Sequence, residues 1–528
     1  MPRSTRRPVH CAAVDLGATS GRVIVGTWHR ATLELTEVHR FGNSFRSLGA
    51  HDYWDLPGLW HEVRTGLLAA KRRFPQLASV GVDTWGVDHV LVNAAGRLVF
   101  PTHAYRDART QPGLQRLARD GKTTALLYAE TGIPNVFYNS SLQLAETVAS
   151  CPAVRDDAAR CLFLPDYFNF LLSGKMENEV SIASTSQLLS VRGLRWSRPA
   201  LAHFGIPARW FHRPIRADRD LGPVTGIPEL RDTRAVAVPG HDTAAAFAAM
   251  PASATGDDLF ISSGTWSLVG YESATPLLVP AAAAARISNE RLGDGRFRPL
   301  TNVIGLWLLE QTLKDLGARP ANAREWRALL GDARRLPAPA RLLDVDDPAF
   351  VNPASMRAAI DAQLQSGRAE RPAPPRVRRH PLGGPGRSAL PTSRAAEYTR
   401  LICDSLGAGH AAAMRRFEQL SGKRFARILL VGGGAKNSLL CQATADTAGL
   451  PVHALELEGS AIGNLASQLI ALGAARDLAE IRRAIAAQFP PTIYRPTPDA
   501  KIVGAALRRD PNAARASHPS RHKAAPTT

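Results

Sequence analysis

Glycines and small hydroxyl residues gather in a loop near the start of the chain, which reads Asp15-Leu-Gly-Ala-Thr-Ser-Gly-Arg22. Glycines let a phosphate approach the backbone, amides and hydroxyls donate to its oxygens, and an aspartate at a strand end can hold Mg²⁺ through water. The loop lacks the Gly-Lys-Ser/Thr ending of a P-loop and the Gly-x-Gly-x-x-Gly of a dinucleotide fold, so those two folds are disfavoured. Alone it is a weak signal, because Gly/Ser turns are common in hairpins.

A second loop of the same kind, Ser262-Ser-Gly-Thr265, lies between the apolar stretches 259–261 and 266–269. Two such hairpins facing each other could clamp a triphosphate from both sides. A third glycine-rich place, Gly432-Gly-Gly434, ends the apolar strand 428–431. Either a sharp turn or the close approach of a flat ligand explains three residues without side chains.

Two further segments place carboxylates where they could act on a sugar. Asp83-Thr-Trp-Gly-Val-Asp88 suits a polyol, because carboxylates accept hydroxyl hydrogens and an indole covers the C–H side of a sugar. Paired aspartates also occur in glycoside hydrolases, so this segment does not choose between the two. In Gly240-His-Asp-Thr243, Asp242 is either the N-cap of the alanine-rich helix that follows or a general base that takes a proton from an alcohol.

The elements that must position these residues alternate between strand and helix. The stretches 9–25 and 258–270 each read as a strand, a tight turn and a second strand, which suggests two similar halves. Helical patterns lie between them, at 56–73, 396–420 and 464–472. Strands alternating with helices indicate an α/β fold.

Composition favours a globular protein of two or three domains over a nucleic-acid binder. The chain has 528 residues, of which 45% are hydrophobic and 21% charged, with a formal net charge of +19. Most of the positive excess lies in three segments of unfolded character, 1–8, 365–394 and 508–528. We expect 366–394 to be an exposed Pro/Arg-rich loop and 510–528 to be a disordered tail.

The lengths of the apolar runs and the spacing of the cysteines indicate the cellular compartment expected for the chain. No run approaches the ~20 apolar residues that cross a bilayer, and the five cysteines are scattered without a Cys-x-x-Cys pair. This pattern predicts no membrane span, no disulfide framework and no zinc site, and it favours a reducing cytoplasm.

Taken in chain order, these pieces resemble the FGGY carbohydrate kinases of the actin/hexokinase-like ATPase superfamily, from about residue 9 to about residue 498. Within the family, the Asp-Thr-Trp-Gly-Val-Asp and His-Asp-Thr blocks are most similar to the branch that acts on L-rhamnulose. The order and spacing of all the blocks carry the resemblance: 14–22 (VDLGATSGR), 82–88 (VDTWGVD), 104–107 (AYRD), 164–168 (LPDYF), 240–243 (GHDT), 262–267 (SSGTWS), 305–309 (GLWLL), 431–434 (VGGG) and 463–464 (GN).

The resemblance implies a site for ATP and Mg²⁺. The first phosphate loop would consist of Ala18, Thr19, Ser20, Gly21 and Arg22. Asp15 would lie near the metal, Thr265 would belong to the second phosphate loop, and Gly433 would lie against the adenosine. On the nucleotide side, Glu310 stands where the family usually carries glutamine, so its negative charge calls for a neutralising partner.

The resemblance also implies a sugar site, with Asp242 as the catalytic base. Its residues would be Gly86, His241, Asp242, Thr243 and Asn302, to which the polyol pattern adds Asp88. The glycine pair that the family carries after Asn-Glu is replaced here by Arg291-Leu292, which would alter the loop leading to Asn302.

The fold and reaction expected from this family are specific. We expect two α/β domains of ribonuclease-H-like type, 8–248 with the sugar side and first phosphate loop, and 249–505 with the second phosphate loop and adenosine site, and an active-site cleft between them. The reaction would convert ATP and L-rhamnulose to ADP and L-rhamnulose 1-phosphate, as in L-rhamnose catabolism. The alternatives are a kinase for another ketose, such as L-fuculose or a pentulose, and a non-catalytic actin- or chaperone-like ATPase switch. The expected partners are a small-molecule sugar and ATP, with no nucleic acid or membrane, and the chain would be a monomer or homodimer.

Overall fold

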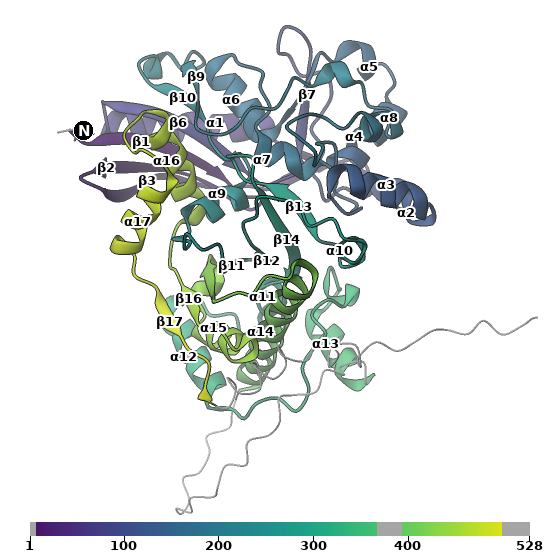
Figure 1. Cartoon of the computed structure of the whole chain (residues 1–528), viewed down its shortest axis with the longest axis vertical. Coiled ribbons are helices and arrows are strands. Elements are labelled where there is room, and N and C mark those ends of the chain that lie inside the picture. Colours follow the sequence, from purple (N-terminus) through teal and green to yellow (C-terminus); the bar gives the residue numbers. More distant parts are fainter. Residues whose placement is uncertain (1–6, 367–392, 499–528) are drawn as a thin grey trace, which may run out of the picture. The chain divides into compact units, whose positions relative to one another are not determined.

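The computed structural model describes residues 7–366 and 393–498, which divide into two compact units (Figure 1). Unit 1 holds the described residues of 7–256, 270–301 and 457–490, and unit 2 holds those of 257–269, 302–456 and 491–498. Each unit therefore combines segments that are distant in sequence, whereas the predicted domains 8–248 and 249–505 are continuous, and that division stays a prediction. The predicted loop 366–394 lies almost wholly outside the described residues, and the predicted tail 510–528 lies wholly outside them.

Unit 1 is built on a six-stranded sheet in the order β3-β2-β1-β6-β10-β9. Its strands are β1 (Val9–Leu16), β2 (Ser20–His29), β3 (Thr32–Gly42), β6 (Leu77–Thr84), β9 (Arg219–Pro223) and β10 (Arg234–Ala237). Strands β1, β6 and β10 are parallel, and β2, β3 and β9 are antiparallel to their neighbours. Parallel pairing brings the carboxyl ends of β1 and β6 to one edge of the sheet, where Asp15 and Asp83 are register partners.

Helices cover both faces of this sheet. They are α1 (Leu56–Arg73), α6 (Leu164–Ser173), α9 (Asp242–Ala249) and α16 (Gly459–Ala471). Val80 and Val82 of β6 belong to the hydrophobic core that α1 and α6 share. Gly81 lies between them and faces α16, because a Cβ there would meet Asn464 and Gln468. Successive strand residues face opposite sides, so α16 packs on the other face, together with α9.

Helix α1 has the bounds that its sequence pattern predicts. Its N-cap is Asp55, whose carboxylate accepts a hydrogen bond from Gly58 N at 2.9 Å. Three basic residues occupy its last turn, where the negative end of the helix dipole favours them. Apolar residues three or four apart form its buried face: Leu56, Leu59, Val63, Leu67 and Ala70.

Unit 1 also contains short strand pairs and further helices. The pairs β4–β5 and β7–β8 are antiparallel, and β13 pairs antiparallel with the first half of β14 (Phe297–Ile304). These elements are β4 (Phe45–Leu48), β5 (His51–Trp54), β7 (His89–Val92), β8 (Arg160–Phe163), β13 (Ser288–Arg291), α2 (Gln111–Arg119), α3 (Gly121–Thr131), α4 (Ser140–Ser150), α5 (Val154–Asp157), α7 (Val180–Ala183), α8 (Arg198–His203), α10 (Pro280–Ala284) and α17 (Leu478–Gln488).

Unit 2 is built on strands in the order β12-β11-β15-β16-β17, with β14, whose residues 302–304 belong to this unit, next to β12. They are β11 (Asp258–Ser263), β12 (Trp266–Gly270), β14 (Phe297–Ile304), β15 (Arg427–Val431), β16 (Val452–Ala454) and β17 (Thr492–Tyr494). Strands β11, β15 and β16 are parallel, as β1, β6 and β10 are in unit 1. In both sheets a pair of strands joined by a tight turn lies beside a parallel strand, which agrees with the two similar halves predicted from the loops.

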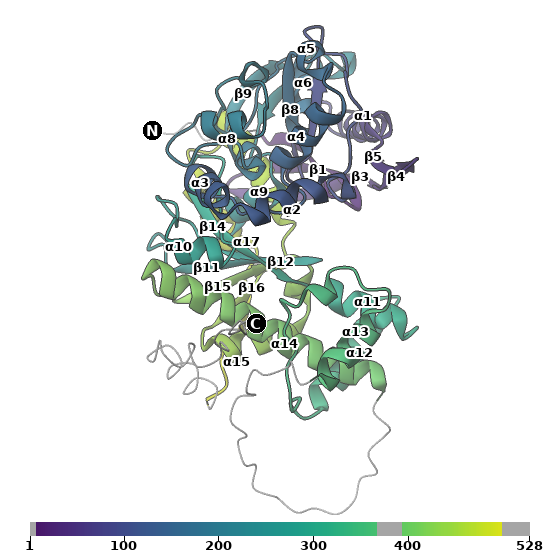
Figure 2. The same ribbon diagram turned by 90° about the vertical axis from the view of Figure 1, so that its right-hand side faces the viewer.

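The helices of unit 2 pack around its longest helix. They are α11 (Trp307–Asp315), α12 (Ala323–Arg335), α13 (Met356–Gln365), α14 (Arg394–Ser421) and α15 (Ser438–Ala448). Helices α11, α12 and α15 pack on α14, and α13 packs on α11 (Figure 2). Among the described residues, no helix is long and apolar enough to cross a membrane. All five cysteines are free, and four of them are buried.

Candidate active site

The predicted first phosphate loop forms the tight turn between β1 and β2. Gly17 N donates to Ser20 O at 2.9 Å, which closes the turn. Asn43 fixes the loop from the end of β3, because its Nδ2 donates to Gly17 O at 2.8 Å and its backbone N donates to Thr19 O at 3.0 Å. Thr19 and Ser20 are exposed. Asn43 lies outside every block that the sequence singled out.

Arg22 and Asp15 form an ion pair beside this loop. Arg22 donates from Nε and Nη2 to Asp15 Oδ2, at 3.0 and 2.7 Å, and from Nη1 to Glu458. Ser460 Oγ donates to the same Asp15 oxygen at 2.6 Å. Burial disfavours the charge of Arg22, but Asp15 and Glu458 together raise its pKa above the ordinary value. Within the described chain no hydrogen bond to Asp15 Oδ1 is found, so that oxygen is available to a ligand.

Asp83 is a second carboxylate at this edge of the sheet. It is fully buried, and its Oδ2 accepts a hydrogen bond from Asn464 Nδ2 at 2.7 Å. Its Oδ1 is buried without a hydrogen-bond partner among the described residues. Burial and the neighbouring charge of Asp15 raise the pKa of Asp83 well above its ordinary range. Two adjacent carboxylates with unoccupied oxygens are an arrangement that a cation stabilises.

Asp88, predicted to bind the sugar, is a buried hydrogen-bonding centre. Its Oδ2 accepts from the indole nitrogens of Trp54 and Trp85, at 2.6 and 2.7 Å, and from Tyr105 N at 3.4 Å. Its Oδ1 accepts from Gln143 Nε2 at 3.3 Å. Burial raises the pKa of Asp88 to about 6. Both oxygens therefore have protein donors, which gives Asp88 a structural part, and its contact with a sugar stays a prediction.

The turn after β6 brings Gly86 against His241. A Cβ on Gly86 would lie 3.3 Å from His241 Nε2, so a side chain there would crowd the imidazole. The next residue, Val87, has a φ of 69°, a conformation that costs a β-branched residue ~1–3 kcal/mol. Thr185 Oγ1 accepts from Val87 N at 3.1 Å and Ser140 Oγ donates to Val87 O at 2.5 Å, which hold the turn in place.

His241 and Asp242 stand at the start of α9. His241 is the N-cap, and Asp242 is the first residue of the helix. The N-cap position, which the sequence offered as the alternative role of Asp242, is therefore occupied by His241. Asp242 Oδ1 accepts from Thr243 N at 2.5 Å and from Thr243 Oγ1 at 3.0 Å, and it lies 3.4 Å from His241 Nε2. Burial, and secondarily the charge of Asp15, raise the pKa of Asp242 above its ordinary value.

A buried ion pair lies behind His241. Arg298 is completely buried and contacts both Glu290 Oε2 and His241 Nδ1 through Nη2. Glu290 Oε2 lies 3.2 Å from the same imidazole nitrogen, and Ser288 Oγ donates to Glu290 Oε1 at 3.1 Å. Burial alone would raise the pKa of Glu290, but the charge of Arg298 and the contact with His241 lower it to about 2. The pair fixes the ring of His241 from the side opposite Asp242.

Glu179 holds the backbone that precedes His241. Its Oε2 accepts from Gly240 N at 3.0 Å, from Ser181 N and Oγ at 2.9 and 2.6 Å, and from Ile182 N at 3.2 Å. Burial raises the pKa of Glu179 to about 7 in spite of these donors. Thr84 N also donates to Gly240 O at 2.9 Å, so the ends of β6 and β10 are tied together here.

In unit 2, the predicted second phosphate loop is the turn between β11 and β12. Gly264 N donates to Trp266 O at 2.8 Å, and Thr265 at its tip is exposed. Gly305 N donates to Thr265 O at 3.1 Å, and a Cβ on Gly305 would lie 2.5 Å from Gly264 O. The loop therefore rests directly on the backbone that leads into α11.

The predicted adenosine side of unit 2 surrounds the glycine run after β15. Gly433 lies beside Leu306, whose Cδ1 would be 3.4 Å from a Cβ on Gly433. On α11, Glu310 Oε2 accepts from Arg319 Nε at 2.7 Å, so the extra negative charge has the neutralising partner that the sequence called for. Asn302 lies on β14 and is exposed.

The predicted site residues thus fall into two groups. Unit 1 holds the first phosphate loop, Asp15 and the residues from Gly86 to Thr243, and unit 2 holds Thr265, Asn302, Glu310 and Gly433. Sequence reasoning missed the groups that support them: Asn43, Glu179, Glu290, Arg298, Glu458 and Ser460. The available signal was a charged residue inside an apolar strand, as at Arg298 in β14, since such charges are buried only when paired.

Comparison with known proteins assigns this arrangement to a family. Residues 11–229 match the N-terminal domain of the FGGY family of carbohydrate kinases, and residues 259–472 match its C-terminal domain. The chain belongs to the FGGY family of carbohydrate kinases. It is therefore an enzyme that uses a sugar and ATP as substrates, as the sequence predicted.

Individual FGGY relatives agree with this assignment. The chain is 37% identical over 495 residues to the rhamnulokinase of Klebsiella pneumoniae subsp. pneumoniae, covering 93% of this chain and 96% of that one. The rhamnulokinase of an Enterobacter species is 35% identical over 489 residues, covering 92% and 94%. Among solved structures, gluconate kinase from Lactobacillus acidophilus has a TM-score of 0.74 at 15% identity, with 95% and 96% coverage. The α/β two-domain fold expected for the family is confirmed.

Proposed function

We propose that this FGGY kinase transfers the γ-phosphoryl group of ATP to O1 of L-rhamnulose, with Asp242 as the general base. The observation that carries the proposal is the state of the Asp242 carboxylate. Both bonds from Thr243 and the contact with His241 use Oδ1, and within the described chain none is found to Oδ2. The side chain is 32% exposed, so Oδ2 can receive a hydroxyl proton. The identity to two rhamnulokinases supports L-rhamnulose as the sugar.

The proposed step is a direct transfer. O1 of the sugar loses its proton to Asp242 Oδ2 while it attacks the γ-phosphorus, and the bond from that phosphorus to the bridging oxygen breaks to release ADP. A raised pKa suits a carboxylate that must take this proton, because it makes the carboxylate a stronger base.

His241 would orient the sugar rather than take its proton. Arg298 Nη2 and Glu290 Oε2 both contact Nδ1, so the buried ion pair engages that nitrogen and leaves Nε2 for the sugar. Nε2 lies on the side of Asp242 and Gly86, where a sugar oxygen can contact it. The absence of a side chain on Gly86 leaves room for that oxygen.

The residues present fit a bound Mg²⁺. No cluster of three or more metal-ligating side chains lies within the described ranges. Magnesium nucleotide sites need no such cluster, because Mg²⁺ keeps several waters and takes one or two carboxylates together with phosphate oxygens. Asp15, through its available Oδ1, and Asp83, through its unpartnered Oδ1, are the carboxylates that would hold it. The ion would neutralise charge on the phosphates.

The remaining predicted residues complete this proposal. The amides and hydroxyls of 18–20 would bind phosphate oxygens, with Thr265 of unit 2 in the same role. Gly433 would lie against the adenosine, Asn302 would contact the sugar, and the Glu310–Arg319 pair would border the nucleotide. Five free cysteines agree with the reducing cytoplasm proposed for the enzyme.

A ketose panel tests the substrate. ADP release is measured with L-rhamnulose, L-fuculose, L-ribulose and D-xylulose, each at several concentrations, with a no-sugar control. The proposal predicts the highest kcat/KM for L-rhamnulose. A higher value for another ketose would assign the enzyme to that sugar, and ADP release that no sugar increases would favour the ATPase switch.

A further inference from the structure

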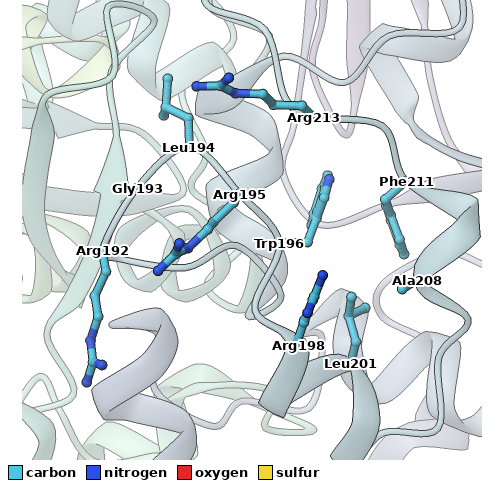
Figure 3. A pocket seen from close by; sticks show the side chains of 10 residues that line it. All are labelled: Arg192, Gly193, Leu194, Arg195, Trp196, Arg198, Leu201, Ala208, Phe211 and Arg213. Atoms are coloured by element: carbon cyan, nitrogen blue, oxygen red, sulfur yellow. The ribbon is translucent and has the colours of Figure 1, made fainter.

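Unit 1 contains a concave pocket that includes none of the candidate active-site residues (Figure 3). Its volume is about 630 Å³, within the range of small-molecule binding sites. Four of the residues that line it are arginines, and none is acidic: Arg192, Arg195, Arg198 and Arg213. A pocket with this lining has a strongly positive electrostatic potential, and its volume can hold a metabolite.

Arg192 and Arg195 are presented by a tight hairpin whose backbone is fixed, whereas Arg198 begins α8 and Arg213 follows that helix in the chain. Leu189 and Trp196 form an antiparallel bridge, and Ser190 N donates to Arg195 O at 2.9 Å. The buried Arg291 anchors the tip, because its Nη2 donates to Val191 O at 2.9 Å. Arg291 stands where the family pattern has a glycine, and its side chain contacts this hairpin.

Apolar side chains form the wall of the pocket. The rings of Trp196 and Phe211 lie 4.4 Å apart between centroids, and Leu201 and Phe211 are nearly fully buried. Trp196 Nε1 donates to His212 O at 2.6 Å, so the indole is held in place and turns an apolar surface to the pocket. Figure 3 shows Arg195, Arg198 and Arg213 on different sides of this ring.

The guanidinium groups are largely unneutralised. Within the described chain, Arg192 has one acidic neighbour, Glu130 at 3.7 Å, and its side chain is 66% exposed. For Arg195, Arg198 and Arg213 no ion pair is found among the described residues. Each guanidinium offers five N–H donors in a planar fork that matches phosphate oxygens. Four like charges around one hollow repel each other, and a bound anion would remove that repulsion.

We propose that this pocket binds an organic phosphate carrying at least two negative charges, with its phosphates on the arginines and its apolar or aromatic part on the wall of Trp196, Leu201 and Phe211. This proposal is independent of the sugar that the enzyme phosphorylates.

Calorimetric titration of the full chain tests the proposal. The probes are uridine triphosphate, inorganic tripolyphosphate and glucose 1-phosphate, which separate ring plus charge, charge alone, and a single phosphate on a sugar. The pocket variant is Arg195→Gln/Arg198→Gln. The matched control is Arg116→Gln/Arg119→Gln, which removes the same charge from exposed positions on α2.

The parent should bind one equivalent of uridine triphosphate more than the pocket variant, and the control should bind like the parent. Tripolyphosphate should bind this site at least tenfold more weakly than uridine triphosphate, because it has no apolar or aromatic group to contact the wall of Trp196, Leu201 and Phe211. Glucose 1-phosphate, with a single phosphate, should bind more weakly still. The kcat and KM for the sugar without added probe should be unchanged in both variants, which separates this site from the proposed catalytic one. Equal stoichiometry in the parent and the pocket variant would overturn the proposal, and so would an equal loss in the control.

Discussion

The Glu290–Arg298 pair behind His241 gives the most quantitative prediction. Glu290→Gln keeps the shape of the side chain but leaves the completely buried Arg298 without its charge partner. The pKa of Glu290 is lowered from 4.5 to about 2, and each pKa unit corresponds to about 1.36 kcal/mol, so ionisation of Glu290 stabilises the folded chain by about 3 kcal/mol near neutral pH. Removing one partner of a buried pair costs about 3–5 kcal/mol, so the two magnitudes agree.

The sign of the pH dependence follows from the lowered pKa. Stabilisation by the Glu290 carboxylate is complete above about pH 4.5 and is lost as the pH falls towards about 2. Glu290→Gln should therefore lower the free energy of unfolding by about 3 kcal/mol at pH 7, and by about half as much near pH 3. Urea unfolding followed by circular dichroism at both pH values measures the difference.

A double-mutant cycle provides the control. Arg298→Met should also be strongly destabilising, because it leaves Glu290 buried without a partner. The double variant Glu290→Gln/Arg298→Met should cost much less than the sum of the single variants, since no unpaired charge remains. A cost below about 1 kcal/mol for Glu290→Gln, or additive costs in the cycle, would refute the assignment of a strong buried pair.

Three further predictions concern other positions. Because the pKa of Glu179 is raised to about 7, the parent should lose about 2–3 kcal/mol of its free energy of unfolding as the pH rises from 4.5 to 7. Glu179→Gln should reduce this pH dependence, measured by urea unfolding, and an unchanged pH dependence would contradict the raised pKa. Gly463→Ala should destabilise the protein by about 1–3 kcal/mol, because a Cβ there would lie 1.8 Å from a carbonyl oxygen of α9. Gly331→Ala in α12 should stabilise it by about 0.5–1 kcal/mol, because a Cβ there meets nothing within 4 Å. Equal shifts of the melting temperature in the two variants would contradict this reasoning. Glu310→Gln should leave the KM for ATP unchanged or lower it. It should change the free energy of unfolding by less than about 1 kcal/mol, because the pair of Glu310 with Arg319 is exposed. A large rise in the KM for ATP would mean that the charge of Glu310 contacts the nucleotide.

The loops and the local elements could be predicted from the sequence because their signals are local. Gly/Ser turns between apolar runs predicted the β1–β2 and β11–β12 turns, and apolar spacing gave α1 its bounds. The predicted helix at 396–420 corresponds to α14, Arg394–Ser421, and that at 464–472 to α16, Gly459–Ala471. In each case the residues that specify the element lie within it.

The supporting residues could not be predicted in the same way, because their partners are distant in sequence. Glu179 acts on Gly240, and Glu458 acts on Arg22, and no local pattern connects either pair. Asp88 shows the converse. Its segment suits a polyol, yet indole and amide donors from α4 and β5 fill both oxygens in the folded chain. Which polar groups remain available to a ligand depends on tertiary contacts.

The turnover number of Asp242→Asn tests the central claim most directly. Asparagine keeps the size of the side chain, and its Oδ1 can still accept the hydrogen bond from Thr243 N, so the start of α9 should be preserved. Its amide cannot take the hydroxyl proton, and loss of a general base costs about 10²–10⁴ in rate. We predict a kcat for L-rhamnulose phosphorylation reduced by that factor, with sugar affinity by calorimetry little changed. A variant that keeps more than about a tenth of the parental kcat would contradict Asp242 as the base.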